Sequence, residues 1–397
     1  MRDDVAAVNS VRRKLFARGA ALAAAASLGG ARVAFAAAPE AARERRLLVL
    51  VELKGGNDGF NTLVPYADDA YAALRPRIAI ARDAVAQLSD ACGLHPSLAP
   101  LLPSWRDGKL AVLQGVGYPA PNLSHFRSIE IWDTASRSDE VLSEGWLARA
   151  FALAPRPQAF AADGVAVGSN ELGPLAGAKV RAIALADTES FQRRARLAKP
   201  APATDNRALA HIRKVEADVR EAAARLTAQR TFATAFPAGA FGNAVRTACE
   251  VVANPAGVGA VRLTLDGFDT HANQAGTQAR LLGELAQGLV ALEAGLRELG
   301  RWDETLVLTY AEFGRRPKEN LNGGTDHGTA GVHFALGGRV RGGLYGAMPD
   351  LARLDGEGNV AHTLDFRSVY ATVLQRWWSI GASEVLGGRF EGVDFLA

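Results

Sequence analysis

An aspartate and a histidine stand side by side in a glycine-rich stretch, residues 323–331. Asp326 and His327 carry a carboxylate and an imidazole, which are common ligands of divalent metal ions. Neighbouring side chains of a regular strand point to opposite faces, but a glycine-rich turn bends sharply enough for both to face one ion. The alternative is a turn in which Asp326 caps the following segment and His327 packs against the protein.

Further polar side chains follow other apolar runs. Four clusters share this position after a predicted strand: Asn57 with Asp58, Ser124 with His125, Asp269 with His271, and Glu312 with Asp326 and His327. Loops that follow neighbouring parallel strands converge at one edge of a sheet. We therefore expect one shared site with ligands for one or two divalent ions, and two ions about 4 Å apart could clamp both oxygens of a phosphoryl-type transfer.

The elements that would position these residues alternate along the chain. Residues 47–53 form a continuous apolar run, typical of a strand covered on both faces. Residues 277–299 carry leucines at helical spacing, and Gly300 stands where a helix commonly ends. Further strands are expected at residues 110–114, 260–265 and 305–310. This alternation predicts an α/β fold, a doubly wound, mainly parallel sheet with helices on both faces.

Composition is compatible with one large domain. The chain has 397 residues, 48% of them apolar and 22% charged, which is enough for an extensive core. We expect a single α/β domain over residues 37–397, with a helical elaboration around residues 190–245 that does not contribute to the site. Residues 1–36 hold six of the 45 basic and two of the 42 acidic residues, which leaves 39 and 40 in the remainder. The basic character thus belongs to the leader and does not indicate nucleic-acid binding.

The leader has the features of an export signal. Arg12 and Arg13 precede a short alanine-rich run at residues 19–30. Ala34 and Ala36 then supply the small residues that signal peptidase requires at its cleavage site. The paired arginines resemble a twin-arginine signal, which predicts a periplasmic or secreted protein handled by the twin-arginine translocase. The run is too short to span a membrane. No other stretch of the sequence reaches 18 apolar residues, so no span is expected in the mature form. The alternative is an uncleaved N-terminal helix.

Export would permit a disulfide between the two cysteines, Cys92 and Cys249. The sequence does not show whether their Cα atoms approach closely enough, so both the bonded and the free form stay open.

Seven stretches give the chain a family resemblance. Over residues 10–380 it resembles the DUF1501 family of exported bacterial proteins, on ELKGGNDGFNT (52–62), LHP (94–96), PNLSHF (121–126), GFDTH (267–271), EFGRR (312–316), TDHGTA (325–330) and DFR (365–367). The family has no established activity. Its layout is similar to that of the alkaline phosphatase and sulfatase superfamily, in which a Ser or Thr nucleophile and Asp/His ligands hold metals at the sheet edge.

This resemblance implies roles for individual residues. Ser124 matches the nucleophile region, and Glu312 is the second catalytic candidate. The implied metal ligands are Asp58, Asp269, His271, Asp326 and His327, with Asn57 as the alternative to Asp58. Beside these implied roles, the residues themselves suggest substrate contacts at Asn57, Asn61, His125 and Arg315.

Each assignment has a structural alternative. Ser124 could cap the following helix, His125 could orient its loop, and Asn57, Asp58 and Asn61 suit a tight turn. Glu312 could pair with Arg315 or Arg316, and these arginines could bind an anion or brace the fold.

The pattern also departs from the superfamily. The spacing from Asp269 to His271 is unusually short, and Gln278 stands where relatives carry a histidine. A late histidine ligand could come only from His333 or His362. The sequence therefore leaves two alternatives to a two-metal site, a site for one metal and a degenerate site.

Two functions follow. The first is an exported hydrolase of phosphate or sulfate esters that uses a divalent ion (Zn, Ca, Mg or Mn) and acts on a small anionic ester. The second is a non-catalytic exported binding or assembly protein on a degenerate alkaline-phosphatase-like scaffold. The short motif around Asp269 and the glutamine at position 278 favour the second.

Overall fold

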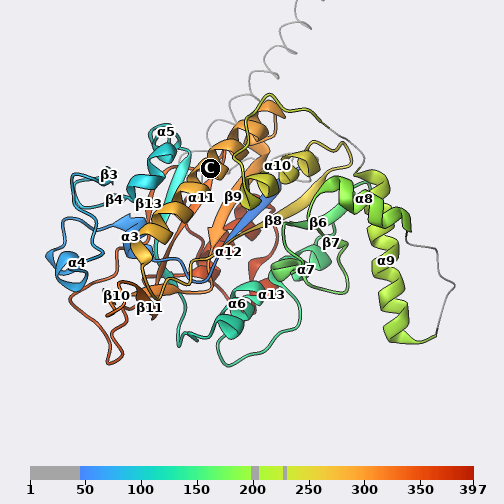
Figure 1. Cartoon of the computed structure of the whole chain (residues 1–397). Helices are drawn as coiled ribbons and strands as arrows, with labels where there is room; N and C mark the ends of the chain where they lie inside the picture. The colour runs from blue at the N-terminus through green and yellow to red at the C-terminus, as the bar shows by residue number, and fades with distance from the viewer. Residues whose placement is uncertain (1–44, 198–204, 227–229) are drawn as a thin grey trace, which may run out of the picture. The chain divides into compact units, whose positions relative to one another are not determined.

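The apolar run that begins at residue 47 forms β1, Leu47–Lys54, which is buried until its last residue. Figure 1 shows this strand within the sheet. The computed structural model describes residues 45–197, 205–226 and 230–397, all of which belong to one compact unit, Glu40–Ala397. The predicted leader, residues 1–36, lies outside the described residues. No helix within the described ranges is long and apolar enough to cross a lipid bilayer.

The central sheet is mixed and mainly parallel. Its order in the described residues is β13 (Gly343–Tyr345), β5 (Leu110–Gly117), β12 (Gly331–Leu336), β9 (Thr305–Tyr310), β1, β8 (Val258–Asp266), β6 (Ala162–Val167) and β7 (Ala182–Leu185), with β14 (Leu364–Asp365) also on β5. Among these strands only β12 runs antiparallel to its neighbours, β5 and β9. The predicted mainly parallel α/β sheet is confirmed.

Helices cover both faces of the sheet. Successive β1 side chains point to opposite faces, so each packs into a different layer. Leu47 and Val49 belong to one core cluster, Leu48 and Leu50 to another. The first cluster contains residues of η1 (Pro96–Leu101), α8 (Thr188–Leu197), α9 (Arg207–Arg225), α10 (Ala240–Val252) and α11 (Gln274–Glu298). The second contains residues of α6 (His125–Thr134), α7 (Trp146–Leu153), α12 (Phe366–Thr372), η4 (Val373–Trp377) and α13 (Ala382–Leu386). Burial on both sides explains why the strand lacks polar alternation.

Smaller elements surround this sheet. A second sheet has the order β2 (Leu63–Val64), β4 (Gly93–Leu94), β3 (Ala86–Gln87). The remaining helices are α3 (Gly59–Thr62), α4 (Asp69–Leu74), α5 (Leu102–Arg106), η2 (Gly173–Leu175) and η3 (Trp302–Glu304). As predicted, Gly300 follows α11 with a positive φ of 67°. Cys92 and Cys249 are buried free thiols, so the structure contains no bond between them.

The glycine-rich stretch forms a strand where the sequence predicts a turn. Asp326 and His327 lie in β11 (Thr325–Gly328), which pairs antiparallel with β10 (Gly314–Glu319). Adjacent strand residues face opposite sides. The expectation that Asp326 and His327 face one ion together is therefore corrected.

His333 on β12 is a buried imidazole beneath this region. It is 3% exposed, and its ring centroid lies 5.3 Å from that of Trp132 on α6. Its Nδ1 has no hydrogen-bond partner within the described part of the chain. Burial lowers the pKa of His333 to about 3, so the folded protein keeps this ring neutral.

This buried ring predicts a pH-dependent loss of stability. The pKa of an unfolded histidine is about 6.5, so below that pH the unfolded chain binds a proton that folded His333 does not. The contribution of neutral His333 to the free energy of unfolding is fully present above about pH 6.5. It falls by up to about 1.4 kcal/mol per pH unit down to pH 3. His333→Gln should flatten the pH dependence of the urea midpoint between pH 7 and pH 5. Equal slopes in both proteins would show that folded His333 takes up the proton.

Candidate metal centre

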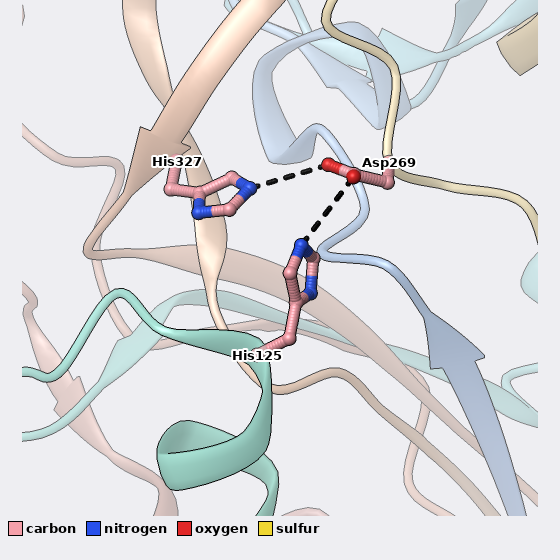
Figure 2. Close-up of side chains that lie close together, drawn as sticks. All are labelled: His125, Asp269 and His327. Carbon is pink, nitrogen blue, oxygen red and sulfur yellow. Dashed lines mark hydrogen bonds and ion pairs between the residues drawn. The ribbon is translucent and has the colours of Figure 1, made fainter.

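Three side chains from distant parts of the chain meet at the carboxyl-terminal edge of the sheet. His125 begins α6, Asp269 lies in the loop after β8, and His327 lies in β11. One ligand atom from each lies within 4.8 Å of the other two. Figure 2 shows both imidazoles turned toward the carboxylate, with His125 Nε2 3.4 Å from Asp269 Oδ2 and His327 Nε2 3.2 Å from Asp269 Oδ1. The structure thus brings together three of the sequence-predicted site residues.

His271 contacts two members of this cluster. Its Nε2 lies 3.0 Å from Asp269 Oδ1 and 3.0 Å from His327 Nε2. Its Nδ1 faces Asp326 Oδ1 at 3.6 Å. Asp326 therefore lies behind His271, on the side away from Asp269, where its charge can orient the imidazole.

Glu312 holds His125 from the rear. Its Oε1 contacts His125 Nδ1 at 2.9 Å and accepts a hydrogen bond of 2.8 Å from the amide of Gly55. The hydrogen bond with Glu312 raises the pKa of His125, although burial opposes it. Nδ1–H donates to the glutamate and Nε2 faces Asp269. A carboxylate behind a histidine in this way is the usual arrangement around a metal-binding imidazole.

His327, like His125, faces Asp269 with Nε2 and makes its outer contact through Nδ1. Its Nδ1 lies 2.7 Å from the carbonyl oxygen of Leu123, to which it donates. Burial lowers the pKa of His327. The neutral ring therefore carries its proton on Nδ1 and presents the lone pair of Nε2 to the cluster.

Asp269 stays ionised because of Arg315. Burial raises the pKa of the carboxyl group, but the hydrogen bond from Arg315 and its positive charge outweigh this and lower it to about 2. Arg315 Nη2 lies 2.7 Å from Asp269 Oδ1. The guanidinium also donates to backbone carbonyls of Gly56, Thr325 and Phe268.

Arg315 is fully buried, with 0% exposed. Its predicted contact with substrate is therefore corrected: the side chain braces the loops that carry the cluster.

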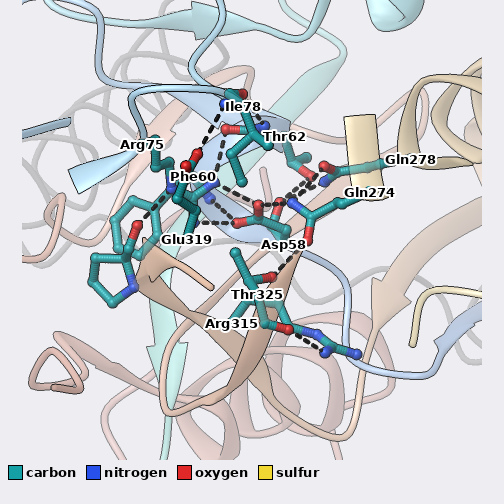
Figure 3. A network of polar contacts seen from close by, with 12 residues as sticks. Asp58, Phe60, Thr62, Arg75, Ile78, Gln274, Gln278, Arg315, Glu319 and Thr325 are labelled. Carbon is teal, nitrogen blue, oxygen red and sulfur yellow. Dashed lines mark hydrogen bonds and ion pairs between the residues drawn. The ribbon is translucent and has the colours of Figure 1, made fainter. Parts of the chain in front are cut away.

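Asp58 lies outside the cluster in a buried polar network (Figure 3). Its side chain is 0% exposed, and Arg75 Nη1 lies 2.5 Å from Oδ2. Arg75 Nη2 donates to Oδ1 at 3.0 Å, and Gln274 Nε2 donates to Oδ2 at 2.5 Å. Asp58 also caps α3 through the amide of Phe60. Because both oxygens are engaged, the expected role as metal ligand is corrected to a structural one.

Asn57 and Asn61 belong to the same buried network. Asn57 exchanges hydrogen bonds with Thr62, and Asn61 accepts from Arg75 and Tyr71. They are 1% and 2% exposed, so their expected contact with substrate is corrected as well. Gln278, at the position of the expected histidine, donates to the backbone oxygen of Asp58 at 3.0 Å.

The other expected ligands and the nucleophile candidate occupy separate positions. His333 is buried below the sheet edge, and His362 lines a different cavity with Asp355. Ser124 is exposed at the N-cap of α6, but its hydroxyl does not cap the helix. It immediately precedes His125.

A cavity of about 580 Å³ opens beside the cluster. His125, Asp269 and Glu312 form part of its wall, and Phe126 lies at its rim. Sequence reasoning missed Glu52 and Asp133, which also line it. The sequence signal for Glu52 was its position as an ionisable residue near the end of an otherwise apolar strand. No sequence signal marked Asp133 on α6.

The sequence model of one protein family matches residues 45–388, under the description "Protein of unknown function (DUF1501)". The chain belongs to this family. No functionally curated protein matches this DUF1501 protein.

Several solved structures are similar to this DUF1501 protein in chain arrangement. Lipoteichoic acid synthase LtaP from Listeria monocytogenes is 10% identical, with 88% of this chain and 76% of that chain covered and a TM-score of 0.39. The PsFucS1 sulfatase from Pseudoalteromonas sp. is 12% identical, with coverages of 90% and 73% and a TM-score of 0.37. Alkaline phosphatase from the Antarctic bacterium TAB5 is 12% identical, with coverages of 74% and 91% and a TM-score of 0.35.

The buried position of Asp58 predicts that its loss affects stability and not metal binding. Asp58→Ala leaves the Arg75 guanidinium buried without its anion, which should lower the free energy of unfolding by about 3–5 kcal/mol. The measurement is urea denaturation together with metal content per chain by elemental analysis. Loss of metal at unchanged stability would instead make Asp58 a ligand.

Proposed function

We propose that this protein is an exported, metal-dependent hydrolase of phosphate or sulfate esters. The observation that carries the proposal is the convergence of three potential metal ligands: one ligand atom each from His125, Asp269 and His327 lies within 4.8 Å of the other two. Nε2 of both histidines faces the carboxylate at 3.2–3.4 Å, which places these atoms where they could share one cation.

The donor set fits a divalent ion. His125, Asp269 and His327 would hold it, and His271 is close enough to supply a further nitrogen. Imidazole-rich sites favour Zn²⁺ over Ca²⁺, Mg²⁺ and Mn²⁺, which prefer oxygen ligands. A bound ion would stabilise negative charge that develops on an ester oxygen and lower the pKa of a coordinated hydroxyl.

The remaining residues would serve this centre in distinct ways. Glu312 fixes the tautomer of His125, Asp326 orients His271, and Arg315 holds Asp269 in its ionised form. Ser124 is the candidate nucleophile, because its hydroxyl is exposed, does not cap α6 and stands next to His125. We further propose that residues 1–36 direct twin-arginine export to the periplasm.

A second function is a non-catalytic binding or assembly protein. The specific observation in its favour is the neighbouring network, where Asp58 is neutralised by Arg75 and amides of Gln274 and Gln278 surround it. No second group of three clustered ligands occurs among the described residues, so two-metal chemistry has no support here. A screen of phosphate and sulfate esters with each added metal that gives no turnover would favour this function.

Removal of one ligand should remove the metal. His327→Ala should lower Zn²⁺ affinity by more than about tenfold, because even loss of an outer-shell partner commonly costs this much. The control is His362→Ala, a half-buried histidine outside the cluster. Elemental analysis and the Zn²⁺-induced shift in Tm provide the readouts. Wild-type protein that binds no metal, or equal binding by all three proteins, would contradict the proposed centre.

Ser124→Ala separates the nucleophile from the metal centre. If the hydroxyl attacks the ester, turnover should fall by more than about a thousandfold while metal content stays unchanged. Steady-state kinetics with p-nitrophenyl phosphate and p-nitrophenyl sulfate give the readout. Retention of turnover in this variant would assign the attack to metal-bound water.

A further inference from the structure

The cavity beside the metal cluster has a strongly acidic lining. Its ionisable wall residues comprise one lysine, Lys54, one histidine, His125, and seven acids: Glu52, Glu130, Asp133, Glu171, Asp266, Asp269 and Glu312. Burial raises the pKa of Asp133 to about 8, so this acid is mainly protonated at neutral pH. Lys54 pairs with Glu171 at 3.1 Å. Even with a divalent ion at Asp269, the six other carboxylates outnumber the positive charges that line this wall. Such a surface disfavours an anionic group and attracts a cationic one.

Two carboxylate oxygens in this wall have no partner among the described residues. They are Glu52 Oε1 and Glu312 Oε2, on side chains 0% and 2% exposed. The other oxygen of each is well bonded: Glu52 Oε2 accepts from Arg262 at 2.6 Å, and Glu312 Oε1 contacts His125. A buried carboxylate oxygen without a donor is costly. Both residues belong to the lining of the same cavity.

Arg262 is a buried cation that is already engaged behind this wall. Arg262 donates to Glu52, to Tyr310 Oη at 3.0 Å and to the backbone oxygen of Glu171 at 2.8 Å. Tyr310 Oη in turn donates to Asp133 Oδ1 at 3.4 Å. Arg262 is not among the residues that line the cavity, and its hydrogen bond to Glu52 goes to Oε2, not to the unpartnered Oε1.

Apolar side chains complete the cavity on the α6 side. Phe126, Ile129 and Leu142 line it, and Phe126 is 89% exposed although it directly follows a cluster histidine. An aromatic face and aliphatic wall suit a short alkyl stem, and an aromatic ring also attracts an ammonium group.

We propose that this cavity binds the ammonium group of a zwitterionic substrate, an aminoalkyl phosphate or sulfate ester whose anionic end lies at the metal cluster. The assignment of the anionic end rests on the proposed function. The ammonium subsite rests on the cavity wall alone.

The test uses the full protein with metal removed by chelation, so that binding is measured without turnover. Calorimetric titration compares butylammonium, butanol and butyrate, which share an alkyl chain and differ in charge. Butylammonium should bind at least about fivefold more tightly than butanol, and butyrate should be the weakest. Equal affinities for butylammonium and butanol would overturn the proposal.

Variants locate the binding site. The double variant Glu171→Gln/Asp266→Asn changes two exposed wall carboxylates and should weaken butylammonium binding about threefold or more. Glu52→Gln, which removes charge at an unpartnered oxygen, should weaken it further if the variant folds. The control, Glu284→Gln, alters a partly exposed acid on α11 and should have no effect. An equal loss in the control and the double variant would show that binding is non-specific.

Kinetics separate this inference from the hydrolase proposal. With metal restored, an aminoalkyl phosphate should have a higher kcat/KM than the alkyl phosphate of equal length, and the double variant should reduce the difference. Absence of all turnover with retained butylammonium binding would refute the hydrolase and leave the ammonium subsite standing. Turnover with no preference for the amine would refute the subsite and leave the hydrolase.

Discussion

The buried guanidinium of Arg315 is the interaction on which the site depends. It binds carbonyls in the loop after β1, in the loop after β8 and in β11, and it contacts the carboxylate of Asp269. A fully buried cation is tolerated only when such partners surround it. Arg315 therefore joins three segments that are far apart in the sequence and keeps Asp269 negative.

The loop after β1 can approach this guanidinium because it begins with two glycines. Gly55 and Gly56 have positive φ values of 112° and 76°. A Cβ atom on Gly55 would lie 2.4 Å from the amide nitrogen of Asp269, and one on Gly56 would lie 2.3 Å from the ring of Phe313. Larger residues would push the loops apart and separate Arg315 from its carbonyl partners.

Identical residue types receive different roles from their surroundings. Asp58 and Asp269 each contact an arginine, but Asp58 is fully enclosed, whereas about half of the Asp269 side chain is exposed. The sequence predicted the sheet, the helix that ends before Gly300 and the convergence of Asp269 with His327, because these follow from periodicity and from parallel strands. It did not predict the role of Asp58, since its partner Arg75 lies in a segment with no recognisable pattern. It also missed the strand that contains Asp326 and His327. This stretch is rich in glycine and does not alternate between apolar and polar residues, and it becomes a strand by pairing with β10 in the folded protein.

The positions of the three cluster residues along the chain have a consequence for biosynthesis. His125, Asp269 and His327 come from the first, middle and last thirds of the described chain, and β12, which lies between β5 and β9 in the sheet, follows all three. A nascent polypeptide thus cannot assemble the complete centre until most of it has left the ribosome. Capture of an ion by these three residues would therefore be a late event, and a chain interrupted before β11 would emerge with an incomplete set of candidate ligands.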